Sequence, residues 1–294
     1  MDALGIHLNR RGARAVVVSG DGTVRSNAEV PEAGDAVRAA HEAVRQAAAD
    51  HSFEVAALAS HGYDTPDVEA AAAALRSDRR FEQLQVVSAG AAAVAAEEWV
   101  GAAKGARHAI CLWIGHDVLA GILLDGKPWS GAHGLAGAAA WLALNPVERQ
   151  DYRKFGSLAA EVSDKGIARR LAWRIQAGDS SAVLERAGDL DAITATHVFD
   201  GARHGDGVSI SVVRDTARYI GMAISNLAAA IDPEVVVLGG PVALAGDLLL
   251  EPVRQECARR LPPAIAEQFR CEISPLGVNG VAIGAARLAA RPPR

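Results

Sequence analysis

The sequence predicts an α/β protein with two lobes and a central cleft. Strand-like apolar runs alternate with helix-like segments in both halves of the chain, and a hairpin-like pair of strands stands at the front of each half. The length of the chain is consistent with two lobes, because 294 residues are enough for two domains that each bury a core of their own. We expect an N-terminal lobe over residues 1–118 and a C-terminal lobe over 119–294, with a final helix at about 278–290 that packs back on the N-terminal lobe.

The elements of the first half follow from the spacing of apolar residues. Short apolar runs predict strands, and alanine, valine and leucine at helical spacing predict helices. The segment "SGDGTV" (19–24) contains the Asp-Gly pair that is typical of a tight hairpin turn. The predicted strands cover residues 3–8, 13–19, 53–59, 85–88, 109–114 and 120–124, and the predicted helices cover 35–50, 68–75 and 91–100.

The second half is mainly helical around two short strands. A long helix over 209–231 ends at "DPE", because proline prevents its continuation. The buried apolar run 235–238 is typical of a parallel strand, and it leads into the turn "GGP" at 239–241. The remaining predicted elements are helices over 157–176, 193–202, 247–260 and 281–290 and a strand over 271–274.

Composition and charge argue against several classes of protein. The net charge is −5 and lysine occurs at only four positions, whereas a nucleic-acid-binding protein typically has a clustered basic face, so we expect no nucleic-acid partner. The three cysteines form no CxxC pair, which argues against a disulfide framework and a zinc site made by cysteines alone. No signal-peptide pattern and no membrane-length apolar run occur, so a cytoplasmic globular protein without membrane association is expected.

Three segments together resemble the ROK family of bacterial repressors and sugar kinases. They are "GILLDGKPWSGAHGLAG" (121–137), "HVFDGARHGDGVSISVVRDTARYIGMAISNLAAAIDPEVVVLGG" (197–240) and "SPLGVNGVAIGAARLA" (274–289). The resemblance runs from residue 5 to residue 288. It implies the actin-like, sugar-kinase and heat-shock ATPase fold, which is ribonuclease H-like, and an assembly as homodimer or homotetramer. The core begins at the first strand, as in the kinase branch of the family rather than in its repressors.

The resemblance also shows where the phosphate loops differ from the family pattern. The first loop of the family has an aspartate followed by two glycines and a threonine, which bring backbone amides to phosphate and support a metal. Here the same place holds His7 and the run Asn9-Arg10-Arg11. The second loop, Gly-Thr-Gly in the family, is Gly115-His116-Asp117, and a carboxylate there would repel a triphosphate.

The groups that act on the sugar differ as well. The family's catalytic base is the aspartate of an Asn-Asp pair, which falls on Ser88 and Ala89, and alanine cannot accept a proton. The family's sugar-contacting glutamate and nearby histidine fall on Ala138 and Trp141. The cysteine-rich zinc loop is absent, because residues 145–163 contain no cysteine, so no metal site is expected.

These changes gather in the cleft that the resemblance implies, while the framework between them is kept. We therefore expect a degenerate sugar-kinase-like protein that binds a small molecule of unknown identity or a partner, without kinase activity and without a cofactor. One alternative is an enzyme that uses His7, His116 and Asp117 in acid–base chemistry on an anionic or aromatic molecule. A second is a weakly active ATP-dependent sugar kinase.

The candidate residues fall into three groups. Each of them also has a purely structural interpretation; the glycine loop at 131–137, for example, is as readily a hairpin turn as a ligand loop. The catalytic candidates are His7, His116 and Asp117; the ligand-binding candidates are Asn9, Arg10, Arg11, His61, Asp64, Ser88, Trp113, His133 and Trp141; and a weak nucleotide-binding candidate is Gly239-Gly240-Pro241.

Overall fold

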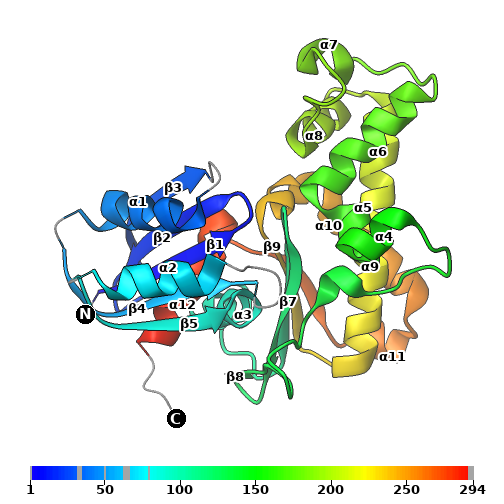
Figure 1. Cartoon of the computed structure of the whole chain (residues 1–294). Coiled ribbons are helices and arrows are strands. Elements are labelled where there is room, and N and C mark those ends of the chain that lie inside the picture. The colour runs from blue at the N-terminus through cyan, green and yellow to red at the C-terminus, as the bar shows by residue number, and fades with distance from the viewer. Residues whose placement is uncertain (1, 32–34, 50, 62–66, 79, 291–294) are drawn as a thin grey trace. The chain divides into compact units, whose positions relative to one another are not determined.

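Two five-stranded sheets organise the chain, each accompanied by helices (Figure 1). The computed structural model describes residues 2–31, 35–49, 51–61, 67–78 and 80–290. It divides into two compact units, which we treat separately. Unit 1 comprises Met1–Trp113, Leu119–Gly137 and Ser274–Arg294, and unit 2 comprises Ile114–Val118 and Ala138–Ile273. The lobe boundary expected after residue 118 stays a prediction.

The first sheet lies within unit 1 and has the strand order β3-β2-β1-β4-β5. The first three strands form an antiparallel meander, and β1, β4 and β5 run parallel to one another. Alternation places Leu4, Ile6 and Leu8 on one face, against the first two helices of the chain. The strands are β1 (Ala3–Asn9), β2 (Gly12–Val18), β3 (Val24–Pro31), β4 (Phe53–Ser60) and β5 (Phe81–Ser88), and the helices on this face are α1 (Ala36–Ala48) and α2 (Asp67–Arg76).

Helices α3 (Ala89–Val100) and α12 (Gly280–Ala289) pack against each other on the opposite face of β1 (Figure 1). Their contact is very close, because a Cβ atom on Gly284 would lie 1.7 Å from the backbone oxygen of Ala92. The buried Glu97 fastens the end of α3: its carboxylate accepts hydrogen bonds from the backbone N–H of Ala102, at 2.9 Å, and from the hydroxyl of Ser274. The final helix therefore belongs to the same unit as the first strand.

The second sheet has the strand order β10-β9-β6-β7-β8. Strands β9 and β10 run parallel, as the apolar run of β9 predicts, and β7 and β8 form an antiparallel hairpin. The strands are β6 (Ala109–Ile114), β7 (Val118–Leu124), β8 (Lys127–Pro128), β9 (Val235–Gly239) and β10 (Arg270–Ile273).

Helices make up most of unit 2. The long helix α9 (Gly207–Ile231) begins at Asp206, whose side chain accepts a hydrogen bond from the N–H of Ser209 at 2.7 Å, and α10 packs along it. The other helices are α4 (Gln150–Phe155), α5 (Ser157–Val162), α6 (Asp164–Gln176), α7 (Val183–Ala187), α8 (Ala195–Arg203), α10 (Gly246–Arg260) and α11 (Pro263–Ala266), with 3-10 turns at Ala139–Trp141, Pro241–Ala245 and Gly277–Asn279. Among the helices that the structure describes, none has the length and hydropathy to cross a bilayer.

Two sequence predictions of local structure need correction, and some short helices were not predicted. The single helix expected over 157–176 is two helices, because Ser163 adopts an extended conformation and its hydroxyl accepts a hydrogen bond from the N–H of Gly166, which starts a new helix. Strand β5 begins at Phe81 rather than at residue 85, since its first half is partly exposed and lacks an apolar run. The short helices α4 and α7 were not predicted.

Candidate functional site

His7 lies on β1, on the sheet face that packs against α12, and it is only 5 % exposed. Its ring meets the ring of Trp113 edge to face, with the centroids 5.9 Å apart. Burial, assisted by the nearby charges of His61 and Arg14, lowers the pKa of His7 from 6.5 to about 3. The imidazole is therefore neutral at physiological pH, at the position where the resemblance places an aspartate.

Asn9, Arg10 and Arg11 form the tight turn between β1 and β2. The Asn9 side chain accepts a hydrogen bond from the N–H of Arg11 at 2.8 Å, which closes an Asx turn. Both arginines are exposed. The hairpin turn is thus stabilised by a side chain, in place of the glycines that the resemblance leads one to expect.

Ser88 and Ala89 stand at the start of α3. Ala89 is fully buried, and Ser88, which is half-buried, makes no hydrogen bond to the first turn of the helix. The next residue, Gly90, lies so close to β7 that a Cβ atom there would approach the backbone oxygen of Ala120 to 2.6 Å. A packed methyl group therefore occupies the position where the sequence resemblance places the family's catalytic base, and that correspondence stays a prediction.

The glycine loop that follows β8 has a structural reason for its last glycine. Gly137 has a φ of +82°, and a Cβ atom there would lie 1.8 Å from the backbone oxygen of Ala120. Its own carbonyl accepts a hydrogen bond from the N–H of Ala120 at 2.8 Å. Gly134 has open space around it, and His133 beside it is exposed. The hairpin thus accounts for Gly137, while Gly134 and His133 are free to meet a ligand.

His116 and Asp117 lie in the turn after β6, within unit 2. The Nδ1 atom of His116 is 3.5 Å from a carboxylate oxygen of Asp164, the first residue of α6, and it has no hydrogen-bond partner among the described residues. The turn is closed by backbone hydrogen bonds from Gly115 N–H to Asp117 and from Asp164 N–H to Gly115, both 3.0 Å. His116 thus faces a carboxylate of its own unit.

The "GGP" turn after β9 is also shaped by a close backbone approach. Gly240 has a φ of +90°, and a Cβ atom there would lie 2.5 Å from the backbone oxygen of Ile114. This explains Gly240 without a ligand. A nucleotide-binding role for Gly239, Gly240 and Pro241 stays a prediction.

The remaining candidates are dispersed between the two units. His61 is half-buried at the end of β4, Trp113 is buried in unit 1, and Trp141 is 51 % exposed in unit 2. Asp64 lies outside the described residues. Within the part of the chain that the structure describes, no three His, Cys, Asp or Glu side chains gather as a metal site requires.

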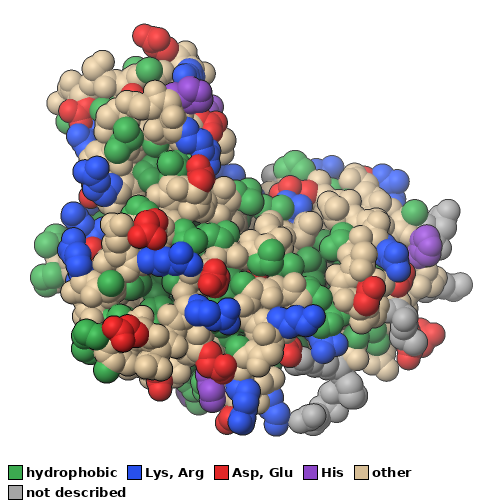
Figure 2. All heavy atoms as spheres, turned by 180° about the vertical axis from the view of Figure 1, so that it is seen from behind, with side chains coloured by type: hydrophobic (Ala, Val, Ile, Leu, Met, Phe, Trp, Pro, Cys, Tyr) green, Lys and Arg blue, Asp and Glu red, His purple; other side chains and the backbone are tan. Residues whose placement is uncertain are grey.

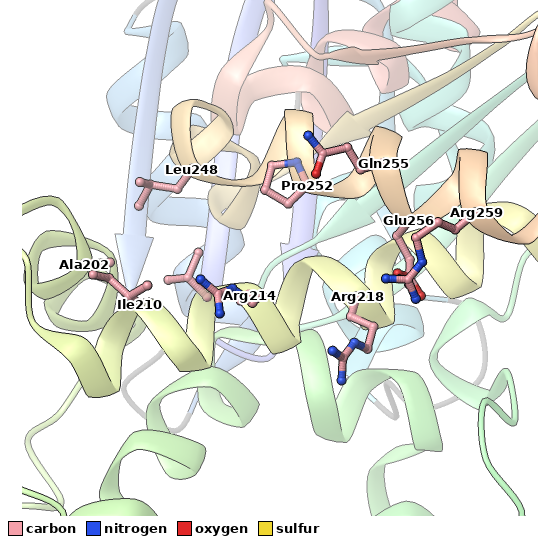
Figure 3. A pocket seen from close by; sticks show the side chains of 10 residues that line it. Ala202, Ile210, Arg214, Arg218, Leu248, Pro252, Gln255, Glu256 and Arg259 are labelled. Atoms are coloured by element: carbon pink, nitrogen blue, oxygen red, sulfur yellow. Dashed lines mark ion pairs between the residues drawn. The ribbon is translucent and has the colours of Figure 1, made fainter.

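Sequence reasoning missed two cavities of unit 2, each with a volume of about 370 Å³. One is the groove between α9 and α10 in Figure 3, where Arg214 and Arg218 extend from α9 opposite Pro252 and Leu248 of α10. The other lies among α5, α6 and α9 and is rich in arginine. The adjacent pair Arg169-Arg170 was the one available signal, and it carries no information about what it faces.

A comparison of the sequence with protein families identifies the family of the chain. The sequence model of the ROK family matches residues 79–291. The chain belongs to the ROK family. The resemblance seen in the sequence is thereby confirmed.

The curated relatives include glucokinases and xylose repressors. The chain is 27 % identical to the glucokinase of Streptomyces coelicolor, over 98 % of both proteins. It is 33 % identical to the glucokinase of Halalkalibacterium halodurans over 64 % of this chain, a match that spans 58 % of that relative, and a match to the Thermotoga maritima glucokinase spans 62 % of it.

Solved structures show the same fold. A ROK glucokinase from Streptomyces griseus, in complex with glucose and AMPPNP, superimposes with a TM-score of 0.86 at 24 % identity, over 98 % of this chain and 99 % of that one. A ROK hexokinase from Thermus thermophilus gives a TM-score of 0.71 at 23 % identity, over 98 % of both chains. The actin-like, two-lobed α/β fold predicted from the sequence is confirmed. The chain is a sugar-kinase-like protein of the ROK family.

Proposed function

We propose that this ROK protein binds a small molecule without phosphorylating it. The observation that carries the proposal is Ala89, a fully buried methyl group at the start of α3, where the family pattern has its catalytic base. Removal of a general base alone lowers a rate by about 10²–10⁴-fold. The proposal extends to a cytoplasmic homodimer or homotetramer that requires no cofactor or metal and binds neither nucleic acid nor membrane.

Two further substitutions support the loss of phosphoryl transfer. Such transfer depends on positioning and on neutralising charge around the phosphates. His7 is buried and neutral, with a pKa of about 3, so it offers no charge to a metal. The turn at Gly115-His116-Asp117 adds a carboxylate where the family pattern has none.

The second candidate function is a weakly active sugar kinase. It is favoured by the 27 % identity to the Streptomyces coelicolor glucokinase over 98 % of both chains. The alternative of acid–base chemistry by His7, His116 and Asp117 is less well supported, because an imidazole with a pKa of about 3 is a weak base and is not protonated near neutral pH.

A phosphotransfer assay tests the proposal. The purified chain is incubated with ATP, magnesium and glucose, N-acetylglucosamine or mannose, and the Streptomyces coelicolor glucokinase serves as the positive control. We expect no sugar phosphate from this chain. Turnover of about 1–100 per second, which is ordinary for a kinase, would contradict the proposal.

A variant and a binding screen distinguish the candidates further. Ala89→Asp returns a carboxylate to the start of α3, and we expect no rescue because the phosphate loops remain altered. If Ala89→Asp instead restored kinase activity, the missing catalytic base would be the only defect, and the rest of the site would still support phosphoryl transfer. In a thermal-shift screen of nucleotides, sugars and sugar phosphates, a ligand of the native state raises the melting temperature. If no compound does so, the binding half of the proposal fails.

A further inference from the structure

The arginine-rich cavity of unit 2 is built around two carboxylates. Arg149 and Arg170 both donate to the buried Glu161, and the hydroxyl of Tyr152 donates to the same carboxylate. The Arg149 contact is 3.0 Å and the Arg170 contact is 2.5 Å. Because Glu161 of α5 is 4 % exposed, this network holds in fixed positions two guanidinium groups, one from the residue before α4 and one from α6.

Arg169 is held beside this network by a second carboxylate. The Nη2 atom of Arg169 lies 2.8 Å from a carboxylate oxygen of Asp151 and also donates a hydrogen bond to the carbonyl of Ala160. Asp151 pairs with Arg149 as well, at 2.8 Å. Both Arg149 and Arg169 stack on the ring of Trp173, with distances of 5.3 and 4.7 Å to the ring centroid. The arginines are therefore pre-oriented at the cavity wall rather than mobile on the surface.

The charges of this cluster do not balance. Three arginines (149, 169 and 170) face two carboxylates (151 and 161), which leaves one positive charge. Arg218 adds another guanidinium to the lining; its partner Asp215 is 3.7 Å away, and both side chains are more than 40 % exposed. In addition, the Nε atom of Arg169 is buried and has no hydrogen-bond partner among the described residues. A buried N–H without an acceptor is unfavourable, and it is the excess of positive charge at the cavity that favours an anionic ligand.

From the cavity and its charge we infer that unit 2 binds a small organic anion, through a phosphate or carboxylate group, between α5, α6 and α9. Guanidinium forks match the oxygens of both groups, and about 370 Å³ suits a molecule at the small end of the usual ligand range. The partly exposed ring of Trp173, 45 % accessible, offers an apolar wall for the rest of the molecule. This site is made by unit 2 alone, so it does not depend on the proposed loss of kinase activity.

Four probes with the full-length chain test the inference. Phenyl phosphate, benzoate and benzyl alcohol share one ring and differ in the charged group, and inorganic phosphate lacks the ring. We expect saturable calorimetric binding of phenyl phosphate or benzoate, whichever group the site prefers, and none of benzyl alcohol. Binding should also change the fluorescence of the tryptophans, and that change should disappear in Trp173→Phe. Equal binding of benzyl alcohol, or saturable binding of no probe, would overturn the inference.

Arginine variants locate the site. Arg169→Gln should weaken binding of the preferred probe about ten-fold, which is the loss expected for one charge-assisted hydrogen bond, and Arg169→Lys should restore it only in part because lysine lacks the fork. Arg218→Gln should weaken binding about three-fold. The matched control is Arg214→Gln, one helical turn away on α9, in the groove of Figure 3 rather than in this cavity, and it should bind as the wild type does.

The variants also keep the inference falsifiable if one of them misfolds. Arg218 is 52 % exposed on its side chain but lines both cavities, so Arg218→Gln decides the matter only together with the Arg214→Gln control if circular dichroism shows that Arg169→Gln is unfolded. Unchanged affinity in Arg218→Gln and in a folded Arg169→Gln would overturn the inference. So would a loss of binding in Arg214→Gln, because the probe would then occupy the other groove.

Discussion

The two units treat buried carboxylates in opposite ways. In unit 1, Glu97 is 2 % exposed and is held by a hydroxyl and a backbone N–H, with no ion pair formed by the described residues. In unit 2, Glu161 and Glu256 are equally buried, and each lies against two arginines. The arginines of Glu256 lie on its own helix, α10, whereas Glu161 of α5 pairs with Arg170 of α6 and with Arg149 before α4. The difference indicates that the core of unit 1 depends on close backbone packing, whereas α5 and α6 of unit 2 are joined by charge.

The surface does not show this contrast. Basic and acidic side chains lie interspersed on the face in Figure 2. Surface ion pairs contribute little to stability, with a median of about 0–1 kcal/mol, whereas a buried carboxylate or guanidinium that loses its partner is strongly unfavourable. Substitutions at buried positions therefore separate the two units.

The largest effect is expected for Glu161→Ala. The substitution leaves Arg149 and Arg170 partly buried without their shared carboxylate, and removal of one partner of a buried pair costs about 3–5 kcal/mol. Urea unfolding followed by tryptophan fluorescence measures the change in unfolding free energy. Glu148→Ala is the control, since Glu148 pairs with Arg153 on the surface with both side chains more than 70 % exposed, and it should cost less than about 1 kcal/mol. Equal effects of the two variants would remove the distinction between the units.

A packing variant is expected to have the next largest effect, in unit 1. Gly284→Ala would place a Cβ atom 1.7 Å from the backbone oxygen of Ala92, so α12 must move away from α3. Overpacking of this kind lowers the unfolding free energy by about 1–3 kcal/mol or more. Gly207→Ala, at the first residue of α9, meets no atom within 4 Å and should be neutral or slightly stabilising. A neutral Gly284→Ala would show that unit 1 does not rely on this approach.

Most of the fold could be predicted from the sequence. Segments such as α1, β4 and α9 bury one face or both, and the spacing of their apolar residues reveals which face is buried. The sequence was insufficient where single side chains decide, as at Ser163, which divides a helix with continuous helical spacing into α5 and α6. The candidate site could be predicted only as positions in the family pattern. That His7 is neutral, and that residues from 149 to 218 converge on one cavity, depends on tertiary packing that no local pattern encodes.

The pH dependence of stability should reveal His7. Its pKa is about 3 in the folded protein against 6.5 in the unfolded chain, so between these values the unfolded chain binds the additional proton. Stability is thus full above pH 6.5 and falls as the pH decreases, by about 2 kcal/mol between pH 6.5 and pH 5. His7→Phe retains a ring against Trp113 and should remove this part of the slope. If His7→Phe left the slope unchanged, the imidazole of His7 would not be the buried neutral group described above.

The smallest effect at neutral pH, and the sharpest test of the contrast, is expected for Glu97→Gln. Burial raises the pKa of Glu97, while hydrogen bonds from Ser274 and Ala102 partly oppose that shift. A folded-state pKa above the unfolded value of 4.5 means that the folded protein takes up the proton first. This group therefore adds stability as the pH falls from neutral towards 4.5, which is opposite in sign to the effect of His7.

In the His7→Phe background, Glu97→Gln should abolish that gain in stability at low pH. It should change the unfolding free energy at pH 7 by no more than about 1 kcal/mol, because the amide relieves a desolvated charge but loses one acceptor. Glu161→Gln should instead be destabilising at pH 7, since its arginines need the negative charge. If both amide variants behaved alike, charge would play the same part in the two cores, and the comparison between the units would fail.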